Sequence, residues 1–280
     1  MLNSSALIVG GTRSGKTTAV ISTFLLPVLK GGADKHGSRV VIIDPKSAEL
    51  SQCGHVLSPD INGGVRHILE AVRDFNRTRI ERQQYINDLG RQRGKAVKWF
   101  EADMKPSLLF LDEWVSLQDL FPRKGTKDEP DYSLTEFQGL IRQIATQGAS
   151  AGCFLIISTA QASVGVGGLE SVVNNSCGIR IMFKPKKDEA SFIWSSKQLE
   201  VMKEWDFSAG DAWYSVDDGV HNRVSFVKFP RLGEQFDEYK ALSDLLKVYY
   251  QGGASCVSKD VPTDLPDSET VSVSDVEKPL

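Results

Sequence analysis

The chain has 280 residues, of which 41% are hydrophobic and 25% are charged. This composition is typical of a globular protein and excludes fibrous and low-complexity classes. Its 33 Lys and Arg residues against 36 Asp and Glu residues give a formal net charge of -3, so the overall charge does not favour nucleic acid as a partner. The four cysteines lie far apart without a C-x-x-C pair, which argues against a zinc ribbon or a disulfide scaffold and favours a reducing compartment.

No membrane-spanning or secretory segment is predicted. The longest apolar run, residues 19–29, is interrupted by Ser22, Thr23 and Pro27 and is too short to cross a bilayer. The N-terminus lacks the basic region and the cleavage site of a signal peptide. We therefore expect a soluble, cytoplasmic protein.

Apolar runs of strand length recur along the chain, separated by segments of helical length. They cover residues 6–9, 40–43, 108–111, 154–158 and 179–183. Continuous apolar strands without alternation are typical of a parallel sheet that is covered on both faces. Residues 212–216 and 224–227 flank Asp217-Asp218-Gly219, a pattern that predicts an antiparallel hairpin near the end.

Helices are predicted between the strands. Residues 17–29 follow a glycine-rich loop, residues 65–72 repeat apolar side chains at helical spacing, and residues 134–144 follow a capping box of Ser133 and Glu136. A last helix is expected over residues 234–250. Strand and helix in alternation predict an α/β fold with a doubly wound, mostly parallel sheet and a C-terminal β-hairpin and helix.

The composition changes after Gly252-Gly253. The last residues are rich in Ser, Asp, Val and Pro, contain no aromatic side chain, and carry six acidic residues against two lysines. Such a segment cannot bury enough apolar surface to fold alone. We therefore expect a folded domain over residues 1–252 and an acidic, disordered tail over residues 253–280.

The loop after the first strand fits the phosphate-binding pattern G-x-x-x-x-G-K-[ST]. Its predicted nucleotide-binding residues are Gly10, Gly11, Thr12, Arg13, Ser14, Gly15, Lys16, Thr17 and Thr18. The glycines let successive backbone N–H groups point at a phosphate, and the helix N-terminus adds its positive end. Lys16 would reach the β- and γ-phosphates and the Thr17 hydroxyl would ligate Mg²⁺. The pattern has the required context, with a strand before it and a helix after it.

A nucleotide-hydrolysing site also needs carboxylates, and the run Leu108-Leu109-Phe110-Leu111-Asp112-Glu113 supplies two at the end of a buried strand. Asp112 would hold the Mg²⁺ ion, and Glu113 would polarise the attacking water. The pair favours an ATPase of the motor type over a P-loop kinase or GTPase.

Further segments resemble one family, the FtsK/SpoIIIE-type DNA translocases within the FtsK–HerA superfamily. Ile43-Asp44-Pro45-Lys46 with Glu49-Leu50 is similar to the family's I-D-P-K-x-x-E-L segment, and Ser158-Thr159-Ala160-Gln161-Ala162-Ser163-Val164 to its A-T-Q-R-P-S-V segment. Gly178-Ile179-Arg180-Ile181-Met182-Phe183 resembles its T-R-I-A-F strand, and Ala209-Gly210-Asp211-Ala212-Trp213-Tyr214 resembles its G-x-G-D-M-L-Y turn. All four follow the P-loop along the chain, in the order in which the family has them.

The resemblance implies a RecA-like motor that binds ATP and Mg²⁺ and assembles as a ring, commonly a hexamer, around double-stranded DNA. It assigns the ATPase core to Lys16, Thr17, Asp112 and Glu113. It makes Gln161 a sensor of the γ-phosphate, although a second alignment puts Ala160 there. Arg180 matches the family arginine and is either a finger acting across a subunit boundary or a partner in an ordinary ion pair.

The chain departs from the family in three respects and leaves alternatives open. No membrane segments or α-domain precede the motor, no winged-helix module follows it, and an arginine expected near Ala149 is missing. A motor this short would borrow its targeting from a partner. A conjugative coupling or genome-packaging ATPase of a mobile element is one alternative. A non-motor ATP-binding switch is another. The basic segment 91–98 either tracks DNA phosphates or is a solvated helix face.

Overall fold

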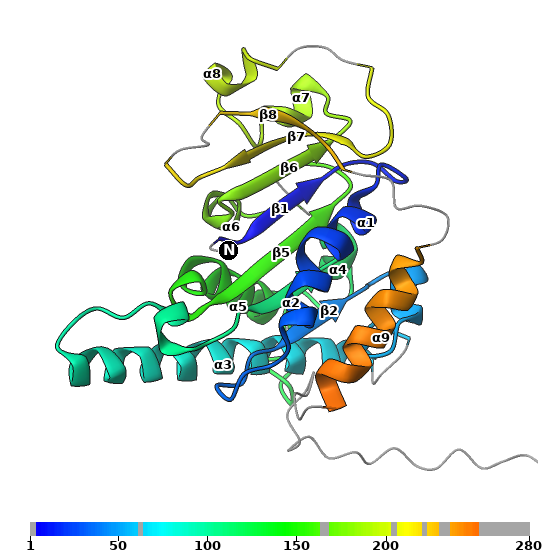
Figure 1. Ribbon diagram of the computed structural model, residues 1–280. Coiled ribbons are helices and arrows are strands. Elements are labelled where there is room, and N and C mark those ends of the chain that lie inside the picture. The colour runs from blue at the N-terminus through cyan, green and yellow to red at the C-terminus, as the bar shows by residue number, and fades with distance from the viewer. Residues whose placement is uncertain are drawn as a thin grey trace, which may run out of the picture.

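The computed structural model describes residues 4–60, 64–162, 168–202, 206–219, 223–229 and 236–251, and these form one sheet with helices on both faces (Figure 1). The eight strands are β1 (Ala6–Val9), β2 (Val40–Ile43), β3 (Val56–Leu57), β4 (Ser107–Leu111), β5 (Cys153–Thr159), β6 (Ile179–Phe183), β7 (Asp211–Val216) and β8 (Ser225–Lys228). Their spatial order is β3-β2-β4-β5-β1-β6-β7-β8.

The predicted fold class is confirmed. Strands β3 to β6 in that order pair in parallel, whereas β7 pairs antiparallel with β6 and with β8. The predicted C-terminal hairpin is therefore present, with residues 217–219 after β7. Bounds of the five predicted central strands differ from the observed bounds by at most one residue at each end, and only the two-residue strand β3 was not anticipated.

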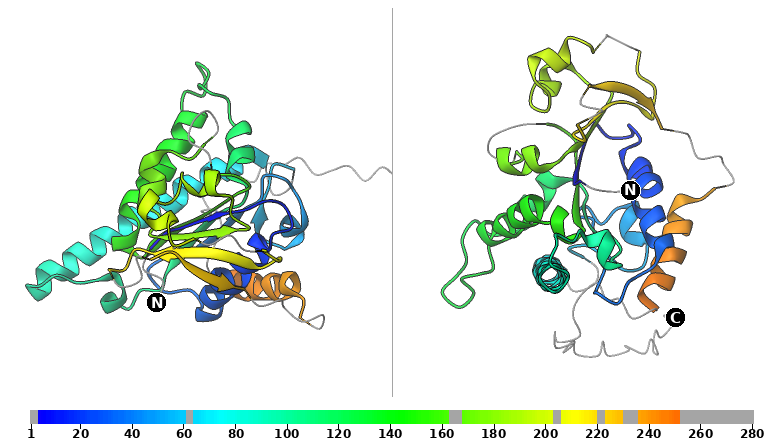
Figure 2. Two further views of the ribbon diagram at one scale, coloured as in Figure 1. Left: turned by 90° about the horizontal axis from the view of Figure 1, so that it is seen from above. Right: turned by 60° about the vertical axis from the view of Figure 1, so that its left-hand side comes forward.

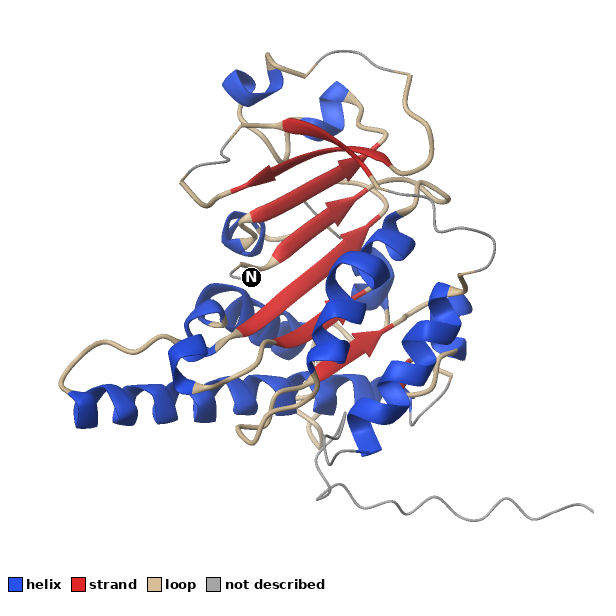
Figure 3. Cartoon of the chain, viewed as in Figure 1, coloured by secondary structure: helices blue, strands red, loops and turns tan. Residues whose placement is uncertain are grey.

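Helices cover the sheet in two layers, as the cartoon and its turned view show (Figure 2, right, and Figure 3). The helices are α1 (Lys16–Val20), α2 (Leu26–Gly31), α3 (Gly64–Arg93), α4 (Trp114–Asp119), α5 (Leu134–Gln147), α6 (Ser171–Ser176), α7 (Lys187–Ala190), α8 (Ser196–Leu199) and α9 (Glu238–Gln251). A π-helical turn, Ile21–Leu25, joins α1 to α2. One layer holds α1, α2 and α9, and the other holds α3, α4, α5 and α6.

Alternate residues of each central strand face opposite helix layers. In β1, Leu7 and Val9 pack with α3, α4 and α5, whereas Ala6 and Ile8 pack with α1, α2 and α9. All four are buried, which explains why the strand reads as a continuous apolar run. This arrangement holds the carboxyl ends of the parallel strands at one edge of the sheet, where α/β proteins bind ligands.

Several helices differ from the predicted bounds. The stretch 17–29 is divided into α1, a π-helical turn and α2, and α5 continues to Gln147. The pattern over residues 65–72 is only the start of the 30-residue helix α3, whose last turns extend beyond the sheet (Figure 1). Helix α9 begins at Glu238 rather than at residue 234, which lies outside the described residues together with the predicted tail, 253–280. No helix in the described part of the chain is long and apolar enough to cross a membrane.

Candidate functional site

The predicted P-loop leaves the carboxyl end of β1 and enters α1. Gly10 lies against β6, where an added Cβ would come within 2.7 Å of the Phe183 Cβ, so a larger residue does not fit there. The Gly10 N–H donates to the Thr159 carbonyl (3.1 Å), and the Ser14 carbonyl accepts from the Gly210 N–H (3.0 Å). The loop is therefore held between β5, β6 and the segment that precedes β7.

Lys16 lies inside this loop and is only 8% exposed. Its ammonium donates to the carbonyl oxygens of Gly10 and of Gly11, the latter at 3.2 Å. Burial lowers the pKa of Lys16, while the nearby carboxylates of Glu113 and Asp112 act in the opposite direction. The ammonium thus sits over the loop backbone at the place where the motif predicts a phosphate.

Asp112 follows β4, and its carboxylate lies beside the end of β5, where the Ser158 hydroxyl donates to Oδ1 at 2.6 Å. Burial raises the pKa of Asp112, and the carboxylates of Asp44 and Glu113 raise it further. Asp112 and Thr17 line the same cavity, which has a volume of about 780 Å³. A carboxylate crowded by negative charge, facing a hydroxyl, is a donor set that fits Mg²⁺.

Protein side chains alone do not complete a metal site among the described residues, because no group of three or more His, Cys, Asp and Glu side chains is arranged around a common point. Mg²⁺ commonly keeps waters and substrate phosphates as its remaining ligands. The predicted pair of Thr17 and Asp112 is therefore compatible with an ion that arrives with a nucleotide.

Glu113 occupies an unusual backbone conformation that turns its side chain into the cavity. Its φ of 47° is in the left-handed region, which is uncommon for residues other than glycine and often marks a functional position. Its Oε1 accepts the Ala160 N–H at 3.0 Å, and its Oε2 accepts the Lys46 ammonium at 3.0 Å. Glu113 is thus buried and held by β2 on one side and β5 on the other.

Lys46 belongs to the Ile43-Asp44-Pro45-Lys46 segment, and its contact with Glu113 makes it a further residue of the site. It follows β2, and the buried carboxylate of Asp44 fixes its loop by accepting the backbone N–H groups of Lys46, Ala48 and Ser51 at 2.9 to 3.2 Å. No local pattern marks Lys46 as part of the site, because its approach to Glu113 depends on the pairing of β2 with β4, which end at the same edge of the sheet.

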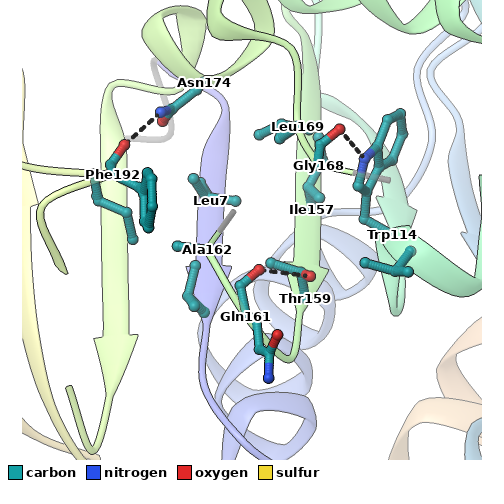
Figure 4. Close-up of a pocket in the computed structure, with 13 residues that line it drawn as sticks. Leu7, Trp114, Ile157, Thr159, Gln161, Ala162, Gly168, Leu169, Asn174 and Phe192 are labelled. Carbon is teal, nitrogen blue, oxygen red and sulfur yellow. Dashed lines mark hydrogen bonds between the residues drawn. The ribbon is translucent and has the colours of Figure 1, made fainter. Parts of the chain in front are cut away.

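Gln161, the predicted sensor, does not line the P-loop cavity. It lines a smaller apolar pocket with Trp114 and Leu169, and Figure 4 shows its amide end turned out of that pocket. Ala160, the residue of the second alignment, is the one that contacts Glu113 through its N–H. This contact is made by the backbone of Ala160, so the role of Gln161 as a sensor stays a prediction.

Arg180 does not line the P-loop cavity either. It is the second residue of β6, where its guanidinium donates to Asp217 Oδ2 at 2.9 Å and its side chain is only 11% exposed. The strand continues for three residues to Phe183, which contacts Gly10, so Arg180 lies roughly 10 Å back from its own P-loop. Any role at a phosphate would concern the site of another subunit.

Helix α9 contributes residues that the sequence did not point to. Its Glu238 accepts the Thr18 hydroxyl at 3.1 Å, and Tyr239 lines the same cavity. Burial raises the pKa of Tyr239 to about 12, helped by the carboxylates of Glu49 and Glu238. These residues lie 220 positions from the P-loop, and no local pattern marks them.

Several arginines of α3, most of them before the basic segment 91–98, form ion pairs within the chain. Arg82 is buried and pairs with Asp34, and other arginines pair with acidic partners on α3 or on the segment before and within α5: Arg66 with Glu129, Arg73 with Glu70 and Glu136, Arg77 with Asp74, and Arg91 with Asp88. Several of these pairs join α3 to neighbouring segments. Within the exposed segment 91–98 itself, Arg91 pairs with Asp88 and Lys98 lies over the Phe100 ring.

Known proteins resemble the chain in sequence and in fold. No protein-family model matches it. Over 151 residues it is 28% identical to the FtsK domain-containing protein YdcQ of Bacillus subtilis, covering 54% of this chain and 28% of YdcQ. EssC (ATPases 2 and 3) from Geobacillus thermodenitrificans has a TM-score of 0.58 at 17% identity, covering 90% of this chain and 45% of that one.

A second solved structure, the pCW3 conjugation coupling protein TcpA with ATPγS, has a TM-score of 0.60 at 17% identity over 88% of this chain and 65% of that one. The chain thus spans less than two thirds of each of these proteins. At 17% identity the solved structures establish the fold alone. The match to YdcQ adds a similarity in sequence over 151 residues. The predicted resemblance is confirmed: in sequence the chain is similar to an FtsK domain-containing protein, and it shares its RecA-like fold with EssC and TcpA.

Proposed function

We propose that this protein is a cytoplasmic, Mg²⁺-dependent ATPase that moves double-stranded DNA as a homo-oligomeric, hexameric ring. The observation that carries the proposal is the single cavity lined by Lys16, Thr17, Asp112 and Glu113. A phosphate-binding cation, a metal-binding pair and a second carboxylate are the parts that ATP hydrolysis requires. The similarity to the FtsK domain of YdcQ supports DNA as the substrate that is moved.

Each residue has a distinct task in this proposal. The P-loop N–H groups and Lys16 bind the phosphates and neutralise charge that develops on them. Thr17 and Asp112 hold Mg²⁺, which supplies further charge neutralisation at the phosphates. Glu113, which is fixed just after the carboxyl end of β4, accepts a proton from the attacking water.

Replacing Glu113 with glutamine is expected to leave ATP binding within a few-fold of the parent value and to lower the turnover number by about 10²-fold or more, because the base is lost while Asp112 and Lys16 remain. Steady-state hydrolysis and ATP affinity, measured on the same preparations, check this. Glu81, which is exposed on α3, provides the matched control as Glu81→Gln. Turnover at the parent rate in Glu113→Gln would assign water activation to another group.

Duplex DNA is expected to raise ATP turnover several-fold, because a motor couples its cycle to the polymer that it moves. Displacement of a third strand from a triplex measures the movement itself.

A coupling ATPase of a mobile element is the alternative supported by the fold shared with TcpA, and a packaging ATPase belongs to the same group. Hydrolysis that is stimulated by a partner protein, without strand displacement, would favour that group.

A non-motor ATP-binding switch is the alternative supported by the contact of Lys46 with Glu113, which keeps the base occupied. A switch binds ATP and barely hydrolyses it, with or without DNA. Turnover that stays at the level of the Glu113→Gln variant under all conditions would favour this function over a motor.

A further inference from the structure

Both oxygens of the Glu113 carboxylate are engaged within the chain. Oε1 accepts the Ala160 N–H, and Oε2 accepts the ammonium of Lys46, each at 3.0 Å. A general base must direct a lone pair at the proton that it removes. The Ala160 contact positions the carboxylate, since this backbone N–H directly follows the end of β5. The Lys46 contact occupies the oxygen that remains.

Lys46 is fixed at its backbone, and its side chain is half-exposed. Its N–H is bound by Asp44, which is 1% exposed, so the start of the side chain cannot shift easily. The side chain itself is 51% exposed, whereas that of Glu113 is 11% exposed. A long side chain of this kind can exchange one anionic partner for another by rotating its own bonds, without moving β2.

The cavity holds two ammonium groups, together with Arg13 and the carboxylates of Asp112, Glu113, Glu49 and Glu238. Lys16 and Lys46 face Asp112 and Glu113, and Lys46 is near enough to Lys16 to contribute to the lowering of its pKa. The γ-phosphate of ATP would bring three anionic oxygens toward Lys16. A terminal phosphate then competes with Glu113 for the second ammonium, whereas ADP has no group at that place.

We propose that Lys46 is a positioning residue that restrains Glu113 in the nucleotide-free protein and turns to the γ-phosphate when ATP binds, which frees Glu113 Oε2 for the attacking water. The proposal rests on the ATPase function proposed above and adds to it a second cation that distinguishes ATP from ADP. It also explains why a buried catalytic carboxylate is paired with a half-exposed lysine: the pair must be separable.

Nucleotide affinity tests the phosphate contact. In Lys46→Met we expect the affinity for ATPγS to fall about tenfold, which corresponds to one charge-assisted hydrogen bond, while ADP affinity stays within twofold. Lys46→Arg should restore most of the preference, because it keeps the charge. Lys240→Met, which removes a lysine from an exposed ion pair with Asp244, is the matched control and should change neither affinity.

A double-mutant cycle tests the restraint on Glu113. Lys46→Met, Glu113→Gln and the double variant are compared by melting temperature, without nucleotide and with saturating ATPγS. Without nucleotide, the melting temperatures should depart from additivity by about 2 °C or more, since the two side chains interact directly. With ATPγS they should be additive, because Lys46 has left Glu113.

Three results would overturn the proposal. Equal losses of ATPγS and ADP affinity in Lys46→Met would make Lys46 a structural residue of the cavity. Non-additivity that persists with ATPγS would mean that the pair never separates, and additivity in both conditions would mean that it never forms. Failure of the parent protein to bind either nucleotide is a different outcome, since it removes the proposed ATPase function itself.

Discussion

Replacing Lys16 with alanine is expected to abolish measurable ATP binding. The Lys16 ammonium is buried in the P-loop on the carbonyls of Gly10 and Gly11, so it is already held where the β- and γ-phosphates would lie. Charge-assisted hydrogen bonds contribute about 1.5–3 kcal/mol each, and losing at least two of them weakens binding by more than about a hundredfold. Lys46, at the far side of Glu113, is anchored to β2 and cannot take the place of Lys16.

Titration with a fluorescent ATP analogue measures this effect. The exposed lysine at the end of α2 gives the control variant, Lys30→Ala, which should bind like the parent. The melting temperature of Lys16→Ala must also be recorded, because Asp112 and Glu113 lose a compensating positive charge in it. A folded Lys16→Ala protein with near-parent affinity for ATP would contradict the P-loop assignment.

The sequence predicted the central sheet well because buried parallel strands carry a continuous apolar pattern. It could not predict the length of α3, because the apolar repeat stops near Phe75 while the helix continues to Arg93. Beyond that point the buried contacts include the guanidinium groups of Arg79 and Arg82, which bind Gln147 and Asp34. Charged residues in such roles look like solvent-exposed ones in a sequence.

The residues of the candidate site also fall into two groups, those that a local pattern predicts and those that depend on long-range packing. Lys16 and Thr17 belong to one local motif, and Asp112 and Glu113 end one strand, so local patterns were sufficient to find them. The part played by Lys46 depends on β2 lying next to β4, although β3 and α3 separate them in the chain. Glu238 approaches Thr18 only because α9 packs against α2 and the turn before it. Strand order and long-range packing are not visible in local spacing.

Arg180 has two interpretations, a finger acting across a subunit boundary and a partner in an ordinary ion pair. Its ion pair with Asp217 follows from the antiparallel pairing of β6 and β7, and it satisfies the structural interpretation within one chain. It does not exclude a second role, because Asp217 is 46% exposed and the pair can open at a subunit boundary. A second arginine that could act across a subunit boundary is Arg142 on α5, whose guanidinium donates to both carboxylate oxygens of Glu170.

If Arg180 completes the site of a neighbouring subunit, Arg180→Ala should lower the turnover number by about 10³-fold, the contribution of an arginine finger acting in trans. Asp217→Asn is the matched control, because it opens the same ion pair and keeps the arginine. A finger predicts a large loss for Arg180→Ala and a small one for Asp217→Asn, whereas a purely structural pair predicts similar, modest losses for both. Arg142→Ala and Glu170→Gln repeat the comparison for the second candidate.

Mixing two inactive variants then tests whether the arginine acts across an interface. In rings assembled from Arg180→Ala and Lys16→Ala subunits, some interfaces join an intact P-loop to an intact Arg180, so part of the activity should return. For the same reason, the specific activity of the parent should rise with protein concentration and with duplex DNA, which would template the ring. Mixed rings that stay inactive at every ratio would exclude Arg180 as a finger. Undiminished activity in protein dilute enough to be monomeric would argue against the ring, because each cavity would then be complete within one chain.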